Sequence, residues 1–262
     1  NAPTTTLIGI GSGSSTISAS SLGTGNINNS IINNNISKAQ YGIYSQGASA
    51  ANKNTGTIIN QNLINSAAVN NVQKGGILVG FDNGATISGN NISNISGTTG
   101  YAWGISLGLT GTTTTTTTGN DVTGATITKN TIGSIRGGST FGVSGIAVAS
   151  VTSGTTLIAN NIISDAFANG TASDIGAGIY IGGGTGSTTN VYYNAITMVS
   201  TLTGGAYSNF GIAINGSNPT VDLRNNIVVN TGSNGANLNR AIGLAYSTFT
   251  NLTSNYNDLY VS

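Results

Sequence analysis

The side chains best suited to acid–base or metal chemistry in this chain are its aspartates, because the sequence contains no Glu, no His and no Cys. They are scattered, and no two lie within two positions of each other: Asp82, Asp121, Asp165, Asp174, Asp222 and Asp258. General acid–base catalysis and cation binding both require such groups to converge. Asp222 beside Arg224 is the best candidate pair, and we expect it to be a surface ion pair or part of a turn. We predict no catalytic residues, no metal site and no cofactor.

Aromatic residues offer a different chemistry, since their rings combine a large apolar face with a polar handle. Several precede or lie within short aliphatic segments. Tyr101, Trp103 and Phe141 are the candidates for contact with a glycan. The alternative is that these rings cover the side of a hydrophobic core, and the sequence leaves both interpretations open.

A run of threonines, Thr112–Thr118, follows Gly111. An ice-binding surface would need Thr at matching positions of successive repeats, whereas this run is consecutive within one stretch. We therefore interpret residues 108–120 as a Thr-rich loop insertion.

The elements that must position these side chains come from an internal repeat. In Ile127-Thr128-Lys129-Asn130-Thr131-Ile132, two aliphatic residues enclose two variable positions, an Asn and one further position. The frame recurs along the chain, with Gln in place of Asn in one copy and an incomplete last copy. The predicted positions of the repeated amide are Asn34, Gln61, Asn90, Asn130, Asn160, Asn194, Asn225 and Asn257.

A second element, a small residue followed by a short aliphatic run, stands between the copies, as in Gly145-Ile146-Ala147-Val148. Its alternation is the period-two pattern of a strand. A repeat of roughly 30 residues holding three short strands fits one coil of a parallel β-solenoid, whereas hairpins would repeat about every 8–12 residues. We predict an all-β fold, a parallel β-helix of about seven to eight coils with three short strands per coil. It would form a single domain over residues 1–262, in which residues 1–29 are an irregular segment or a strand-exchange arm.

Stacked coils explain why an amide repeats. Strands of adjacent coils lie about 4.8 Å apart, so equivalent side chains touch. Asn tolerates a left-handed turn, and stacked amides donate and accept along a ladder. Each such hydrogen bond contributes about 1 kcal/mol net. We therefore predict a structural asparagine ladder, in which Gln61 is the exception.

The frame Ile127–Ile132, followed by Gly145–Val148, resembles the repeat of right-handed parallel β-helix proteins of the pectate-lyase-like superfamily, over about residues 30–262. The last part, from Asn225 to Tyr260, looks like large β-helix surface proteins secreted by Bacteroidota and their relatives. The resemblance implies a right-handed, single-stranded β-helix. It implies no particular activity, because the superfamily includes lyases, hydrolases, tailspikes and adhesins. Its enzymes typically cluster carboxylates around calcium, and the scattered aspartates of this chain depart from that pattern.

Composition limits the partners. Charged residues make up 5% of the 262 residues and the net charge is +1, without a basic cluster. We therefore expect no nucleic-acid binding and no membrane insertion. The polar, Cys-free, Asn- and Thr-rich composition favours an extracellular or cell-surface location in a prokaryote.

Function follows from the ends of the predicted stack. Open end coils expose unpaired strand edges, and neither end of the sequence shows a capping helix. We expect a non-enzymatic extracellular structural protein. It is either a piece of a longer surface stalk, or a homo-oligomer or filament subunit assembled through its two ends, with Thr4–Ile10 as a strand for the neighbouring subunit. The alternatives are an adhesin that binds a polysaccharide and, less favoured, a polysaccharide lyase or hydrolase acting through Asp222.

Overall fold

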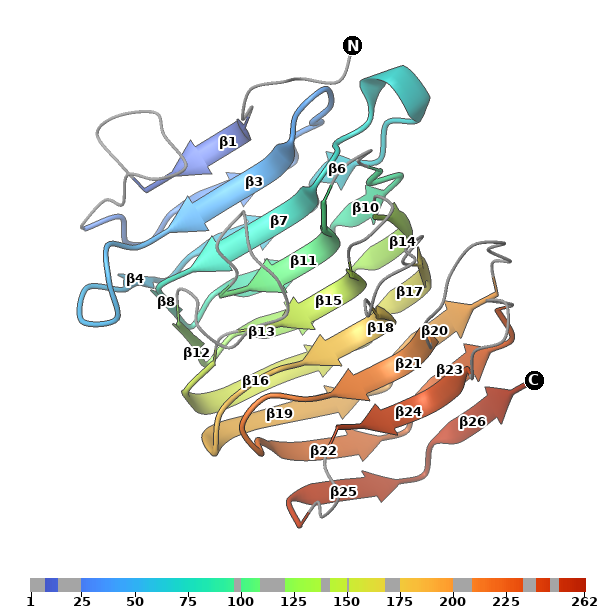
Figure 1. The fold of residues 1–262 in the computed structure, drawn as a ribbon. Coiled ribbons are helices and arrows are strands. Elements are labelled where there is room, and N and C mark those ends of the chain that lie inside the picture. The colour runs from blue at the N-terminus through green and yellow to red at the C-terminus, as the bar shows by residue number, and fades with distance from the viewer. Residues whose placement is uncertain are drawn as a thin grey trace.

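The computed structural model describes residues 8–13, 25–96, 100–108, 121–137, 142–149, 151–167, 175–199, 209–232, 239–245 and 250–262. These residues form an all-β parallel solenoid in which every coil lies on the previous one, and the two termini lie at opposite ends of the stack (Figure 1). The predicted fold class is thereby confirmed. The single helical element of the described residues is a 3-10 turn, η1 (Ala68–Asn70).

Three long sheets run the length of the stack, with one strand of each sheet per coil. The first sheet consists of β1 (Ile8–Ser12), β3 (Tyr41–Gln46), β7 (Gly75–Gly80), β11 (Ala102–Leu107), β15 (Val143–Val148), β18 (Gly176–Ile181), β21 (Asn209–Ile214) and β24 (Arg240–Leu244). The second consists of β2 (Ser30–Ile32), β5 (Ile58–Asn60), β9 (Thr86–Ser88), β13 (Thr126–Thr128), β16 (Ser153–Ala159), β19 (Gly186–Tyr192), β22 (Thr220–Arg224) and β25 (Leu252–Asn255). The third consists of β6 (Leu63–Ile64), β10 (Asn91–Ser93), β14 (Thr131–Arg136), β17 (Ile162–Phe167), β20 (Ala195–Met198), β23 (Ile227–Asn230) and β26 (Asp258–Val261).

The coils from β3–β5–β6 to β24–β25–β26 each contribute to all three sheets, and the chain advances about six turns between them. β1 and β2 belong to a preceding, partial coil. A short fourth sheet, β4 (Asn54–Thr55), β8 (Asp82–Asn83) and β12 (Val122–Thr123), adds a further strand to three coils of the N-terminal half.

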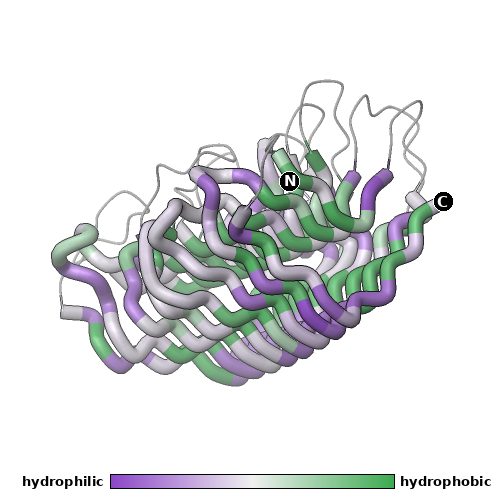
Figure 2. Tube along the Cα trace, turned by 90° about the horizontal axis from the view of Figure 1, so that it is seen from below, coloured by the Kyte–Doolittle hydropathy of each residue, from purple (hydrophilic) through white to green (hydrophobic). Residues whose placement is uncertain are grey.

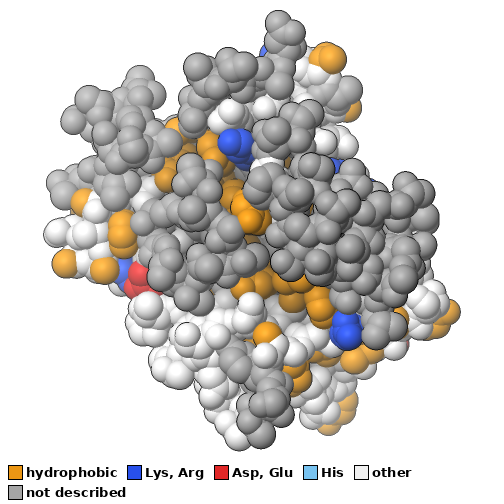
Figure 3. Space-filling model, in the orientation of Figure 1, with side chains coloured by type: hydrophobic (Ala, Val, Ile, Leu, Met, Phe, Trp, Pro, Cys, Tyr) orange, Lys and Arg blue, Asp and Glu red, His pale blue; other side chains and the backbone are white. Residues whose placement is uncertain are grey.

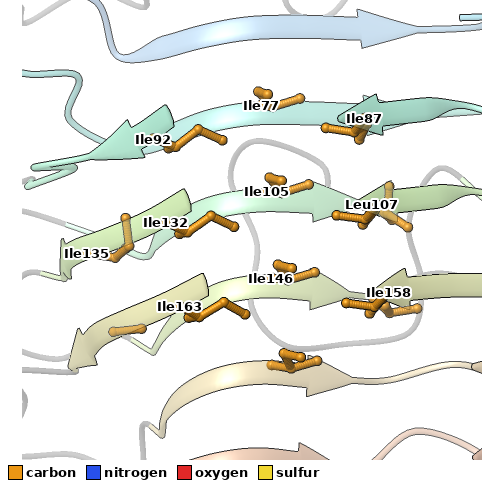
Figure 4. Packing of buried hydrophobic residues seen from close by; sticks show 14 of the residues in the cluster. Ile77, Ile87, Ile92, Ile105, Leu107, Ile132, Ile135, Ile146, Ile158 and Ile163 are labelled. Carbon is orange, nitrogen blue, oxygen red and sulfur yellow. The ribbon is translucent and has the colours of Figure 1, made fainter. Parts of the chain in front are cut away.

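All strand pairs within the long sheets are parallel and in register, so like residues lie on like. One column of the first sheet joins Ile43, Ile77, Ile105, Ile146, Ile179 and Ile212, each 0–1% exposed. Figure 4 shows such columns meeting in the core, and Figure 2 shows polar and apolar positions recurring from coil to coil. Burying each Ile contributes roughly 1.5–3 kcal/mol. This stacking, rather than contacts within one coil, supplies the core.

The residue before each Ile of the first sheet is small because side chains of the third sheet and the backbone of the next coil come very close to it. A Cβ atom on Gly104 would lie 2.5 Å from Ile132 Cγ2, in the third sheet, and 2.5 Å from the carbonyl oxygen of Gly145. The first and third sheets therefore pack against each other through the glycine column.

The sheets differ in burial. In β7, β11, β15 and β18 every residue is buried, whereas strands of the other two sheets alternate between buried and partly exposed positions. In the view of Figure 3, which looks onto the first sheet, hydrophobic side chains are visible in the middle of this face.

The Asn90–Asn130 step spans 40 residues, whereas the step before it spans 28, yet it advances the chain by one coil. The additional residues lie between the end of β11 and the start of β12. The predicted insertion at residues 108–120 falls in this interval, but residues 109–120 lie outside the described part of the chain.

Candidate functional site

The most extensive polar arrangement among the described residues is the asparagine ladder at the corner between the second and third sheets. Its members are Asn34, Asn62, Asn90, Asn130, Asn161, Asn194, Asn226 and Asn257. In each step the backbone N–H and the side-chain Nδ2 of one Asn both donate to Oδ1 of the next Asn, at 2.9–3.0 Å. The Nδ2 group also donates to a carbonyl of the preceding coil, as from Asn130 to Ile87 at 3.0 Å. The interior amides are thus buried with their hydrogen bonds satisfied.

At three coils the predicted ladder position is wrong by one residue. The ladder contains Asn62, Asn161 and Asn226 in place of the predicted Gln61, Asn160 and Asn225, and the other five predicted residues lie in it. The error is a slip of register, which moves a strand's side chains to the opposite face. The frame had been anchored on outward-facing aliphatic residues, among them Ile58, Ile162 and Ile227, which are 39–57% exposed. The ladder Asn instead follows an inward-facing residue by three positions and precedes another by two, as Asn161 does between Ile158 and Ile163.

The left-handed turn is also placed differently. The residue before each ladder Asn, not the Asn itself, has the positive φ, between 54° and 65°: Asn33, Gln61, Gly89, Lys129, Asn160, Tyr193, Asn225 and Tyr256. We call this set the corner column. Gln61 is therefore no exception in the ladder; it occupies the corner column.

Of the aromatic candidates, Trp103 lies in β11 of the first sheet and Tyr101 directly precedes this strand. The rings of Tyr101 and Trp103 stack with centroids 6.0 Å apart and an interplanar angle of 11°. Trp103 is 5% exposed and packs against Ala147 and Ala149. Because it is buried, this ring has little free face for a ligand, and the core-covering interpretation fits it better. Phe141, the third candidate, lies outside the described residues.

The aspartates are engaged in separate structural contacts. Asp121 accepts a hydrogen bond from Lys53 Nζ at 2.6 Å and one from the Thr152 backbone N–H at 2.8 Å. Asp165 accepts from the backbone N–H of Val199 at 3.1 Å. Asp174 lies outside the described residues, and Asp258 is exposed on β26. Within the described ranges, no three His, Cys, Asp or Glu side chains come close enough together to hold a metal ion.

Asp82, on β8 of the short sheet, is the one fully buried carboxyl among the described residues. Its Oδ2 accepts a hydrogen bond from Thr57 Oγ1 at 2.6 Å, while Oδ1 is buried without a hydrogen bond of ordinary geometry. Burial raises the pKa of Asp82 to about 6, although Thr57, the Ala85 backbone N–H and Lys53 act in the opposite direction. This burial could not be predicted from the sequence, because the neighbours of Asp82 come from other coils.

Asp222 and Arg224 form the predicted surface pair, on the outer face of β22. Arg224 Nε donates to Asp222 Oδ1 at 2.8 Å, and the Tyr192 hydroxyl donates to Oδ2 at 2.8 Å. The hydrogen bond from Arg224 holds the pKa of Asp222 below its ordinary value. Both carboxylate oxygens therefore accept from neighbours on the protein surface.

The two ends of the stack differ. In the C-terminal coil the inward-facing Leu244, Leu259 and Val261 are 44–45% exposed. In the N-terminal coil the inward-facing Ile31 and Ile36 are 8% and 6% exposed. The inward-facing residues Ile31 and Ile36 near the N-terminal end are thus more buried than those of the C-terminal coil. Moreover, β1 pairs with β3 of the same chain, so residues 8–12 are already part of the sheet, and residues 4–7 lie outside the described part.

Fold and ladder define the class: a parallel β-solenoid with an internal asparagine ladder. Comparison of the chain with protein-family models, with curated proteins and with solved structures found no match. No helix in the described ranges is long and apolar enough to cross a membrane.

Proposed function

We propose that this protein is an extracellular structural protein, without catalytic activity, that assembles head to tail with further copies of itself through its end coils. The observation that supports this most is the C-terminal coil, β24–β25–β26. Its inward-facing aliphatic residues are about half exposed, although their equivalents in the preceding coil, such as Val228 beneath Leu259, are fully buried. A coil of the same design placed on this end would bury them.

The hydrogen bonds of the ladder all run in the same direction along the stack, so the two ends are complementary to each other. Every ladder step runs from donors on one coil to Oδ1 of the next coil. At the C-terminal end the Asn257 backbone N–H therefore lacks its acceptor, and at the N-terminal end Asn34 Oδ1 lacks its donors, within the described residues. Head-to-tail stacking would join the two. Such a contact is heterologous and does not close on itself, which leads to a filament.

A non-catalytic role is supported by the contacts of the carboxylates. Asp121 and Asp222 pair with cations and Asp82 is sealed in the interior, so they point to structural roles rather than to a converging acid and base. Membership of the pectate-lyase-like superfamily and a cell-surface location in a bacterium belong to the same proposal. They are supported by the ladder between two parallel sheets and by the low charge of the chain.

Sedimentation velocity over a wide concentration range, with negative-stain images of the same samples, tests the proposal. We expect concentration-dependent growth into rods. Leu259→Asp, which places a charge on the inward face of the last coil, should leave a monomer. Tyr260→Ser is the matched control, because Tyr260 is the adjacent, outward-facing residue and is 57% exposed; it should still assemble. A chain that stays monomeric at all concentrations, or assembly that survives Leu259→Asp, would reject head-to-tail stacking.

A further inference from the structure

Two members of the corner column are not explained by the fold. Asn and Gly suit a positive φ best, and they fill four of its eight positions. Tyr193 and Tyr256 instead hold a bulky aromatic residue in this conformation, with φ of 56° and 54°. Backbone strain of this kind is a pointer to function when packing does not account for it.

Packing does not account for these rings. Tyr193 is 61% exposed and Tyr256 is 78% exposed. Tyr193 lies in an interior coil, so its exposure does not come from the open end of the stack. Folding thus gains little from either ring, and an Asn at these positions would serve the turn better.

Beside the two tyrosines lies the Asp222–Arg224 pair. The ladder register places Asn225 between Tyr193 and Tyr256 in the corner column, and Arg224 precedes it on the outer face of β22. The Arg224 side chain is 50% exposed. Around the pair, on the outer faces of β19 and β25, lie Asn190, Thr253 and Asn255, which the strand pairing places next to Asp222 and Arg224.

We propose that this lateral surface, formed by Tyr193, Asp222, Arg224 and Tyr256, binds a neutral, linear polysaccharide that runs along the solenoid axis. The rings would stack on sugar faces, and the ion pair would offer an acceptor and several donors to neighbouring hydroxyls. The two tyrosines are two coils apart, a span of about 9.5 Å at the usual strand spacing. This is a length that a short stretch of an oligosaccharide covers.

The neighbours of the tyrosines favour a sugar over other ligands. The centre of a protein–protein interface is depleted of charged residues, whereas here an ion pair with surrounding amides and hydroxyls fills the centre. The charge of Arg224 is balanced by Asp222, so the surface does not select anions. The site lies on the side of the stack, and it does not depend on whether copies join at their ends.

Affinity electrophoresis tests the proposal, with native gels that contain hydroxyethylcellulose, glucomannan or arabinoxylan, and a fourth with the anionic polygalacturonate. We expect at least one neutral polymer to retard the protein. Tyr193→Asn should weaken that retardation at least about threefold, as expected for the loss of one aromatic contact. Because Asn suits the turn, this variant should fold, which circular dichroism verifies. Arg224→Gln should weaken retardation as well.

Lys129→Asn is the matched control, since Lys129 occupies the same corner column two coils before Tyr193; retardation should not change. The proposal is overturned if no neutral polymer retards the wild-type chain, if only polygalacturonate does, or if Tyr193→Asn behaves like Lys129→Asn.

Discussion

The N-terminal and C-terminal coils are built from the same repeat, yet their cores are exposed to different degrees. Ile31 and Ile36, at the start, are almost as buried as residues in the middle of the stack, whereas Leu259 and Val261, at the end, are nearly half exposed. The ladder is also directional, because each coil donates and the next accepts. A solenoid of identical units is therefore not symmetric along its axis, and its two ends should respond differently to the same substitution.

The largest difference in stability loss between an interior coil and the C-terminal coil should come from substitutions in the ladder. Asn161→Ala removes the acceptor of both the backbone N–H and Nδ2 of Asn130, which are buried. Each unsatisfied group costs about 1–3 kcal/mol, so the loss in unfolding free energy should be about 4 kcal/mol. Asn257→Ala does the same to Asn226 at the exposed end and should cost clearly less. Chemical denaturation measures both, and equal losses would contradict the difference between interior and end.

The next largest effect concerns the two ends directly. Ile31→Ala opens a cavity in a covered core and should lower the unfolding free energy by about 3 kcal/mol. Leu259→Ala removes a side chain that is 45% exposed and should cost about 1 kcal/mol in the monomer. If Leu259→Ala destabilises a dilute sample as much as Ile31→Ala, the C-terminal coil is covered in solution.

The short sheet of the N-terminal half should make this half sensitive to pH. The pKa of Asp82 is raised from 3.8 to about 6, so the folded state holds its proton more tightly than the unfolded state does. Stability should therefore fall as the pH rises from about 4 to 6, by up to about 3 kcal/mol, and stay low above that.

Asp82→Asn should raise stability at pH 7.5 by about 2 kcal/mol and flatten this part of the pH profile, because it removes the buried charge. Asp258→Asn, on the exposed C-terminal strand, is the control. It should change neither the stability at pH 7.5 nor the shape of the pH profile. Unfolding midpoints measured at pH 4.5 and pH 7.5 test this prediction. A wild-type chain that is more stable at pH 7.5 than at pH 4.5 would contradict the raised pKa of Asp82.

The smallest effect separates the ladder from the column beside it. Asn160 has a φ of 57°, so Asn160→Ala should cost about 1 kcal/mol through strain, and Asn160→Gly almost nothing. Substitution of the adjacent Asn161 should cost several times more. Were Asn160→Ala the more damaging of the two neighbours, the ladder would have to be reassigned to Asn160.

The period, the three strands per coil and five of the ladder residues could be predicted, because equivalent residues repeat wherever stacking buries them. The remaining ladder positions could not, since Gln61–Asn62, Asn160–Asn161 and Asn225–Asn226 each offer adjacent amides. At these coils exposed aliphatic residues such as Ile162 stand at the same spacing from the first amide as the inward-facing aliphatic residues do from the ladder Asn in other coils. The burial of Trp103 and Asp82 depends on neighbouring coils far away in sequence. The positive φ of Tyr193 and Tyr256 could not be predicted, because the turn falls one residue before the ladder Asn rather than on it.

The central claim, a directional ladder that ends at an open coil, is tested most directly by amide hydrogen exchange in a dilute, monomeric sample. The backbone N–H groups of Asn90, Asn130, Asn161 and Asn194 each donate to the next Oδ1 and should exchange slowly. The Asn257 N–H has no next coil and should exchange fast. An Asn257 amide protected as strongly as that of Asn130 would contradict the account.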